Sequence, residues 1–391
     1  MLRAVKVRLY PTKVQASAIR QNIGNARFVY NHFLALRKAA YEKDKTNIGF
    51  SALCLMLTEL KKELDFLNLS DSTSLQQSIK DMDTAYTNFF KHGTGFPRYH
   101  KKCEGYGSFR VTMSNSIKDG KLKAGKHRNL TFRCSKRDRE RLENYPIRNI
   151  TVSMNAGLYY ASCLIDLPDP KDVDPEFGTF RFEACGLDLG VKKPVALAYK
   201  TGRGTIAYRS TGYANITDLI EKEKRRKRYQ RRLARKVRGS NNYKKCKTRL
   251  QRAFKAERDY RKNFVEHTSR TLAKNFALIA FEDLNLSNMT KAVKKNADGV
   301  RKGKKAKSGL NKSLLRNSHY QLRLRTTQKA EERGGMVVAV DPKYTSQQCS
   351  CCKSIDKKNR KSQANFKCLS CGYSKNADYN AARNIMNRAL Q

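Results

Sequence analysis

The chain has 391 residues, of which 82 are Lys or Arg and 34 are Asp or Glu, so its formal net charge at pH 7 is +48. This length predicts two to four modules, and this charge predicts a polyanionic partner, because bound phosphates release their counterions. A membrane is the weaker candidate: no stretch is long and apolar enough to span a bilayer, and the N-terminal segment lacks the apolar core of a secretion signal. We therefore expect a cytoplasmic protein.

The first half of the chain changes its pattern twice. Residues 4–9 alternate apolar and basic side chains, which predicts a half-exposed strand, and residues 13–90 then carry apolar side chains at helical spacing. A Gly- and Pro-containing break at 93–102 ends this helical part. Residues 107–166 predict short strands separated by turns, typical of a small β-barrel. The first strand is expected to pair with this barrel, which makes the helices an insertion.

The second half begins after a Pro- and Asp-rich segment, 166–178, that predicts a linker. From Phe182 onward the pattern predicts an antiparallel meander of three strands. Residues 217–275 are helical and strongly basic, and Gly239 with Asn241–Asn242 predicts a turn between two helices.

Two further strands follow, at 277–281 and 336–340, with a helix between them and a last helix from Asn376. The basic, low-complexity segment 291–312 predicts a flexible loop, because it has few apolar side chains to bury. An RNase H-like fold has this order of elements: a three-stranded meander, a helical segment, and two more strands in βα alternation.

Three acidic residues stand where such a fold would bring them together. Asp188 ends the first strand of the meander, Glu282 ends the fourth strand, which lies beside the first, and Asp378 opens the last helix. Three convergent carboxylates can hold two Mg²⁺ or Mn²⁺ ions, about 3.5–4 Å apart, that activate a water and stabilise the leaving oxygen. One acid alone would be a cap or a surface charge. Asp283 is expected to be structural, since neighbours on a strand face opposite ways.

Four of the eleven cysteines form two C-x-x-C pairs with 15 residues between them, which predicts a closed, structural zinc site. Gly372 suits the tight turn after the second pair, whereas Lys353 follows the first, and Cys351 is expected to lie outside the site. The other cysteines are expected to be reduced thiols. The predicted zinc ligands are Cys349, Cys352, Cys368 and Cys371.

The basic helices predict contact with nucleic acid rather than a solvated face, because so many positive charges with few acids repel one another without a polyanion. The six His residues form neither an H-x-H pair nor an HExxH motif. This counts against a transposase that holds a metal with His and attacks with Tyr.

Together these motifs resemble TnpB, the family of transposon-encoded RNA-guided nucleases related to the type V CRISPR effectors. The resemblance runs nearly end to end and is strongest in "IAFEDLNL", "VDPKYTSQQCSCC" and "FKCLSCGYSKNADYNAARNI". It implies an α+β multidomain protein: a small wedge β-barrel with an inserted helical recognition domain, and an RNase H-like (RuvC) nuclease domain carrying a zinc ribbon. The implied parts are a first wedge strand (1–10), the recognition domain (11–100), the wedge barrel and linker (101–180), the RuvC-like nuclease (181–344), the zinc ribbon for target nucleic-acid binding (345–375) and the last RuvC segment (376–391).

The resemblance also implies the partners and site roles. Asp188, Glu282 and Asp378 would be the Mg-binding catalytic triad, and a guide RNA from the transposon end would pair with double-stranded target DNA. The helical segment and barrel would read a short flanking motif, with Gln76 and Gln77 as base readers, since Gln bonds adenine through two hydrogen bonds. An exposed helix face is the alternative for both glutamines. One copy of the chain with one RNA, associated with the nucleoid, is expected.

Four alternatives stay open. A miniature type V CRISPR effector shares these motifs, so only the neighbouring locus would separate the two. A nuclease-inactive RNA-guided repressor is disfavoured by the intact triad. A structural DNA-binding protein would use the carboxylates as caps. A strand-joining transposase lacks its His or Tyr constellation. One departure from the family is Lys353, which stands where glycine is frequent after the second ribbon cysteine.

Overall fold

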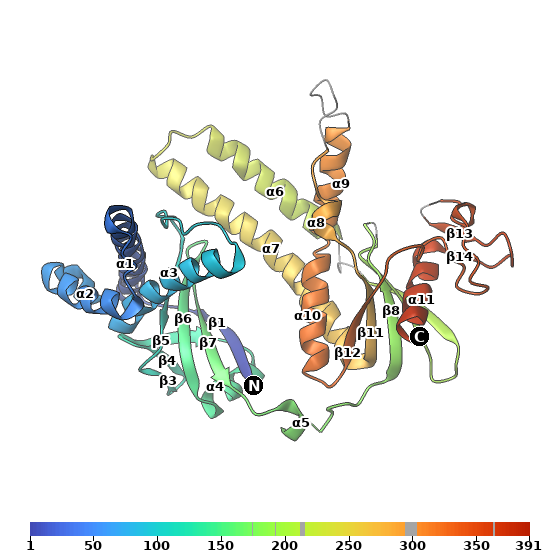
Figure 1. Cartoon of the computed structure of the whole chain (residues 1–391), viewed down its shortest axis with the longest axis horizontal. Helices are drawn as coiled ribbons and strands as arrows, with labels where there is room; N and C mark the ends of the chain where they lie inside the picture. The colour runs from blue at the N-terminus through green and yellow to red at the C-terminus, as the bar shows by residue number, and fades with distance from the viewer. Residues whose placement is uncertain (174, 192, 212–215, 294–302, 363) are drawn as a thin grey trace. The chain divides into compact units, whose positions relative to one another are not determined.

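The computed structural model describes residues 1–173, 175–191, 193–211, 216–293, 303–362 and 364–391. The chain forms two compact units, a first unit over Met1–Pro168 and a second unit over Asp169–Gln391 (Figure 1). Among the helices in these described ranges, none has the length and apolar content needed to cross a membrane.

The first unit is built on a seven-stranded antiparallel sheet in the order β2-β6-β7-β1-β5-β4-β3. Strand β1 pairs with β7 along its whole length and with β5 at its end, which confirms that the first strand joins the later ones. Within the described residues the two end strands, β2 and β3, are not paired, so a closed barrel stays a prediction. The strands are β1 (Leu2–Leu9), β2 (Tyr106–Val111), β3 (Asn115–Lys118), β4 (Lys121–Ala124), β5 (His127–Arg133), β6 (Ile147–Asn155) and β7 (Leu158–Asp166).

The helices of the first unit lie mainly between β1 and β2 in the chain, as an insertion in the sheet. They are α1 (Lys13–Asp44), α2 (Phe50–Glu63), the 3-10 turn η1 (Asp65–Leu69) and α3 (Ser72–His92), with α4 (Lys136–Asn144) later. Thr12 and Gln15 form a capping box that fixes the start of α1. A shared core of fully buried Leu53, Leu75 and Met82 packs α2 and α3 together with α1.

The second unit contains a five-stranded sheet in the order β10-β9-β8-β11-β12. The strands β8, β9 and β10 form the expected antiparallel meander, and β11 runs parallel to both β8 and β12. The first and fourth strands are therefore neighbours, as the sequence predicted. The strands are β8 (Phe182–Asp188), β9 (Val195–Lys200), β10 (Ile206–Thr211), β11 (Phe276–Glu282) and β12 (Met336–Val340).

Helices cover both faces of this sheet. Apolar residues of α7 and α10, among them Phe264 and Leu322, pack on one face, against Cys185, Leu187 and Phe281. Helix α11 packs on the other face, where Ile385 meets Ala280 (Figure 1). The remaining elements are α5 (Pro170–Val173), α6 (Ile216–Ala234), α7 (Asn241–Asn275), α8 (Leu286–Met289), α9 (Lys304–Arg316), α10 (His319–Glu331), η2 (Lys357–Asn359), β13 (Asn365–Lys367), β14 (Ser374–Asn376) and α11 (Ala377–Ala389).

Two local expectations are corrected. Ser240 caps α7, so Asn241 and Asn242 begin that helix instead of forming the turn. The expected linker, 166–178, contains the boundary between the two units and also the short helix α5, next to Asp174, which is outside the described residues. Residues 304–312 belong to α9 rather than to a loop, and 294–302 of the same expected loop lie outside the described residues.

Helix α9 forms in spite of its loop-like composition because its partners are distant in sequence. Lys312 and Arg316 form ion pairs with the buried carboxylate of Glu223 on α6, at 3.1 and 2.9 Å. Leu314 on the same helix is buried. Tertiary contacts thus override a weak local preference.

Candidate active site and zinc ribbon

A glycine in β8 lets the last helix lie directly on the sheet. A Cβ atom at Gly186 would stand 2.2 Å from the carbonyl oxygen of Ala382 and 2.4 Å from the amide nitrogen of Met386. Any side chain at this position would therefore overlap the backbone of α11. Asp378 lies one helical turn before Ala382, so it shares the face that meets β8.

The two strand-end acids lie on that same side of the sheet. Asp188 and Glu282 are the last residues of β8 and β11, and the register pairs Leu187 with Phe281 just before them. Because side chains alternate along a strand, Asp188 shares the face of Gly186, and Glu282 shares the face of Ala280. This is the face of the sheet that α11 covers, so the structure brings all three predicted acids to the same edge of the sheet, on the same side.

Burial and like charges act on these carboxyl groups. Burial raises the pKa of Asp188 to about 7, with further raising contributions from Glu282 and Asp378 and a lowering one from Arg360. Burial also raises the pKa of Glu282, against a hydrogen bond from Thr345 and the charges of Arg388 and Arg360. Partly buried carboxylates that repel one another are a donor set that a bound divalent cation would stabilise.

The acids are less tightly gathered than the cysteines. In the part of the chain that the structure describes, the four ribbon cysteines are the one group of metal-ligating side chains whose ligand atoms all lie within 4.8 Å of one another. The three acids fit a divalent metal by the chemistry of their oxygen ligands and by the face that they share, and the roles of Asp188, Glu282 and Asp378 stay a prediction.

The sequence did not identify three residues that act on the acids or on the helix beside them. Gly186 makes room for α11, Thr345 donates a hydrogen bond of 2.5 Å to Glu282 Oε1, and Arg360 brings a positive charge from the ribbon. Only Gly186 carried a readable signal, because a glycine inside a buried strand often marks a close backbone approach.

Asp283 is turned away from this cluster. Its carboxylate is exposed and accepts a hydrogen bond of 2.9 Å from Arg323, and its amide donates to Val340 O. This surface ion pair agrees with the structural role expected from strand alternation.

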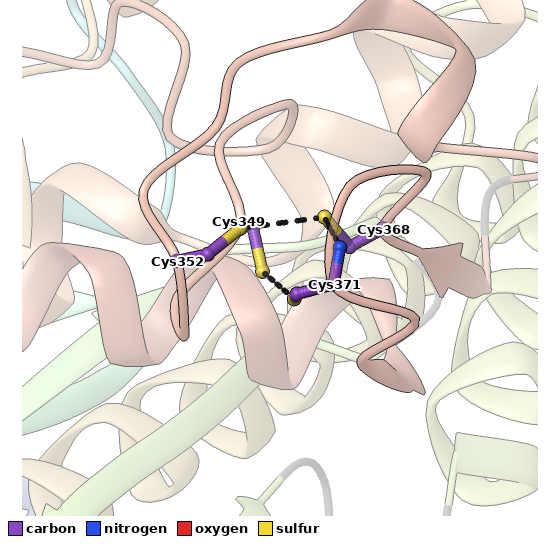
Figure 2. A group of neighbouring side chains, drawn as sticks. All are labelled: Cys349, Cys352, Cys368 and Cys371. Carbon is purple, nitrogen blue, oxygen red and sulfur yellow. Dashed lines mark hydrogen bonds between the residues drawn. The ribbon is translucent and has the colours of Figure 1, made fainter.

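The four ribbon cysteines face one another from two turns (Figure 2). The sulfur atoms of Cys349 and Cys371 lie 3.7 Å apart, and those of Cys352 and Cys368 lie 3.5 Å apart. Tetrahedral zinc with bonds of about 2.3 Å would separate its sulfur ligands by about 3.8 Å. The cluster is compatible with structural zinc, and Cys351 stays exposed.

The two turns of the ribbon have the same backbone conformation. Lys353 and Gly372 both follow the second cysteine of a pair, and both are left-handed, with φ of 66° and 71°. Their amides donate to Cys349 O and Cys368 O, at 3.0 and 3.2 Å. Lys353 therefore occupies a conformation that favours glycine, and the ligand positions are retained.

The predicted base readers lie on α3 in the first unit. Gln76 is exposed and Gln77 is half-buried, beside the fully buried Leu75 and Ile79. This placement fits both base reading and an ordinary helix surface, so the base-reading role stays a prediction.

Acids inside the basic helices join elements together. Glu257 on α7 accepts from Arg226 on α6 at 2.6 Å and also pairs with Arg261. Glu266 on α7 pairs with Arg325 and Lys329 on α10, at 2.9 and 2.8 Å. Because Glu257 and Glu266 are already paired with Arg and Lys side chains, they neutralise little of the positive charge on the other basic residues of these helices.

Family models match three parts of the chain. Residues 1–46, which form β1 and α1, match a model described as "Helix-turn-helix domain", and residues 181–293 match one described as "Probable transposase". Residues 319–385, which include the ribbon, match one described as "Cas12f1-like, TNB domain".

Relatives match almost the whole length. A protein of Escherichia coli (strain K12) named "Putative RNA-guided DNA endonuclease InsQ" is 33% identical over 389 residues, covering 98% of this chain and 92% of the relative. A second protein described as an RNA-guided DNA endonuclease, from Streptomyces pristinaespiralis, is 29% identical, with 99% and 89% covered. The solved "mini-RNA-guided endonuclease CRISPR-Cas_phi3" shares the fold, with a TM-score of 0.50 at 11% identity, covering 100% of this chain and 92% of that one. With its motifs, matched domains and full-length relatives, the chain belongs to the TnpB family.

Proposed function

We propose that this chain is a transposon-encoded, RNA-guided DNA endonuclease that cuts DNA next to a short flanking motif. The observation that carries the proposal is the set of half-buried acids on one face, in a chain whose relatives of nearly equal length are named as such nucleases. A protein that used its acids only as caps would not need to bring them to one face, where Glu282 and Asp378 raise the pKa of Asp188.

Asp188, Glu282 and Asp378 would hold the metal, with Mg²⁺ as the expected ion and Mn²⁺ as a substitute. When two such ions are bound, they activate a water and stabilise the leaving oxygen of the phosphodiester. The raised pKa of Asp188 means that this carboxyl holds a proton for part of the time near neutral pH, so a cation held there would compete with that proton.

The domain roles follow from the order of the elements. We assign residues 181–344 with 376–391 to an RNase H-like (RuvC) nuclease, and 345–375 to a zinc ribbon that binds target nucleic acid. Residues 1–10 with 101–180 would form the wedge, and residues 11–100 the recognition domain.

Guide RNA and double-stranded target DNA are the partners that the charge of +48 favours. Gln76 and Gln77 would read bases of the flanking motif. One copy of the chain with one guide RNA, bound to the nucleoid, is the expected form.

A cleavage assay with matched variants tests the proposal. The protein is purified with RNA expressed from its own locus and given a guide-matched plasmid target with a randomised flank and Mg²⁺. Guide-dependent cleavage should favour one flank and be lost in Glu282→Ala. The neighbouring Asp283→Ala should cleave like the wild type, because that carboxylate pairs with Arg323 at the surface. Tight guide-dependent binding without cleavage would instead identify an RNA-guided binding protein.

A further inference from the structure

Helix α11 has a second, polar face that the acid site does not use. Asn380, Asn384 and Arg388 follow one another at intervals of four residues, and both asparagines are fully buried. Buried amides are costly without hydrogen bonds, so their partners show what this face holds.

The partners are main-chain groups of Thr345, Gln348 and Ser350, in the segment that connects β12 to the first ribbon turn. Asn384 Nδ2 donates to Thr345 O at 2.9 Å and to Gln348 O at 2.7 Å, and Asn380 Nδ2 donates to Gln348 O at 2.8 Å. The amide of Ser350 donates to Asn380 Oδ1 at 3.0 Å. The same helix that carries Asp378 therefore fixes the backbone of this connecting segment.

One side chain of the connecting segment reaches the acids. Thr345 is 3% exposed, and its Oγ1 lies 2.5 Å from Glu282 Oε1 and 3.0 Å from Pro342 O. A hydroxyl group has one hydrogen to donate, and the shorter contact places it toward Glu282. Glu282 is the last residue of β11, and this hydrogen bond ties its carboxylate to the connecting segment.

We propose that Thr345 is a positioning residue that holds the Glu282 carboxylate in the orientation needed to bind a divalent cation, and that Asn384 holds Thr345 in place. The proposal rests on the proposed nuclease function and adds a residue to its site. Partners of metal-binding carboxylates fix their orientation, and their loss typically lowers metal affinity or activity by about 10- to 100-fold.

The competing explanation is purely structural. In that case the Thr345 hydroxyl serves only the turn at Pro342, and its loss would lower stability without changing how cations bind at Glu282. The two explanations differ in the effect on metal affinity measured in the folded protein.

Thr345→Val removes the hydroxyl at nearly constant shape, and Thr345→Ser keeps the hydroxyl and removes the methyl group. Thr326→Val is the matched control, because Thr326 is also fully buried in the second unit and, among the described residues, its hydroxyl bonds Leu322 O within α10 alone. Each zinc-loaded, full-length variant is titrated with Mn²⁺, and free Mn²⁺ is followed by electron paramagnetic resonance. The Mg²⁺ dependence of guide-directed cleavage is measured in parallel.

We expect Thr345→Val to weaken Mn²⁺ binding by about 10- to 100-fold and to raise the Mg²⁺ needed for half-maximal cleavage. Thr345→Ser should return both toward the wild type, and Thr326→Val should change neither. If Thr345→Val does not fold, Thr345→Ala is titrated below its melting temperature with the same expectation.

The inference is overturned if Thr345→Val binds Mn²⁺ like Thr326→Val, or if Thr345→Ser is as weak as Thr345→Val. It is also overturned if Glu282→Gln leaves Mn²⁺ binding unchanged, because there would be no carboxylate site to position. Failure of the proposed function looks different. A wild type that does not cleave, but whose Mn²⁺ affinity depends on Glu282 and Thr345, would retain the inference and remove the nuclease.

Discussion

Gly186→Ala tests whether the contact between β8 and α11 builds the acid site. The added Cβ would stand 2.2 Å from Ala382 O, whereas ordinary contacts begin near 3.4 Å. Because the opposing atoms belong to a helix backbone, no side chain can rotate away to relieve the overlap. The helix must therefore move from the strand by about 1 Å, and Asp378 moves with it.

The cost has two parts. Overpacking of a well-packed core by one methyl group destabilises a protein by about 1–3 kcal/mol. A displacement of about 1 Å in a catalytic group can lower the rate by about 100-fold. The substitution is thus expected to reduce cleavage more strongly than it reduces the amount of folded protein.

Hydrogen exchange of the α11 peptide, measured by mass spectrometry, reports the local effect. Exchange of residues 377–389 should become about 5- to 150-fold faster in Gly186→Ala, as a loss of 1–3 kcal/mol requires. Gly24→Ala is the matched control, because this glycine lies inside α1 and, beyond the helix's own nearby backbone and its chain neighbours, no described atom lies within 4 Å of an added Cβ. The control should stabilise the first unit by about 0.5–1 kcal/mol. Unchanged exchange and cleavage in Gly186→Ala would refute the reasoning.

Three further outcomes are expected. In metal-free protein, Asp188→Asn should raise the melting temperature more at pH 8 than at pH 5. The pKa of Asp188 in the folded protein, about 7, lies above its ordinary value of 3.8. The wild type therefore loses up to about 4 kcal/mol of folding stability as the pH rises from the ordinary pKa to the folded one. Equal gains at both pH values would contradict burial as the cause of the raised pKa. Lys353→Gly should stabilise the ribbon by up to about 1 kcal/mol and slow zinc release to a chelator, because it removes a left-handed lysine; faster release would argue against that strain. Glu257→Gln should lower stability by about 2 kcal/mol in thermal unfolding, since it weakens a buried, charge-assisted link between α6 and α7. The exposed Glu221→Gln should have no such effect, and equal losses in both variants would show that the link contributes nothing.

The sequence was sufficient for the placement of Asp188 and Glu282. Each acid ends an apolar run, and parallel strands in register bring such ends together, so alternation along the strands decides which face they share. The ribbon was predictable for a similar reason, because the spacing of its cysteines is local. The catalytic role of the acids stays a prediction, and Glu282→Ala beside Asp283→Ala tests it directly.

The contacts that hold these residues were not predictable from local patterns. Thr345 reaches Glu282 across 63 positions of sequence, and Arg360 acts on Asp188 from another element. Helix α9 was expected to be a loop because its composition is polar, and the buried Glu223 that anchors it lies 93 positions earlier. Such contacts depend on the packed fold rather than on a period or a motif.

The dependence of the acid site on α11 also bears on the order of protein synthesis. Asp378 is made about 190 residues after Asp188, an interval of roughly 10–40 s at ordinary rates of translation. Until α11 emerges, the face of β8 at Gly186 has no helix to cover it, and the third carboxylate does not yet exist. Under the proposed roles of the three acids, a ribosome-bound chain has therefore synthesised its whole first unit well before its nuclease site is complete.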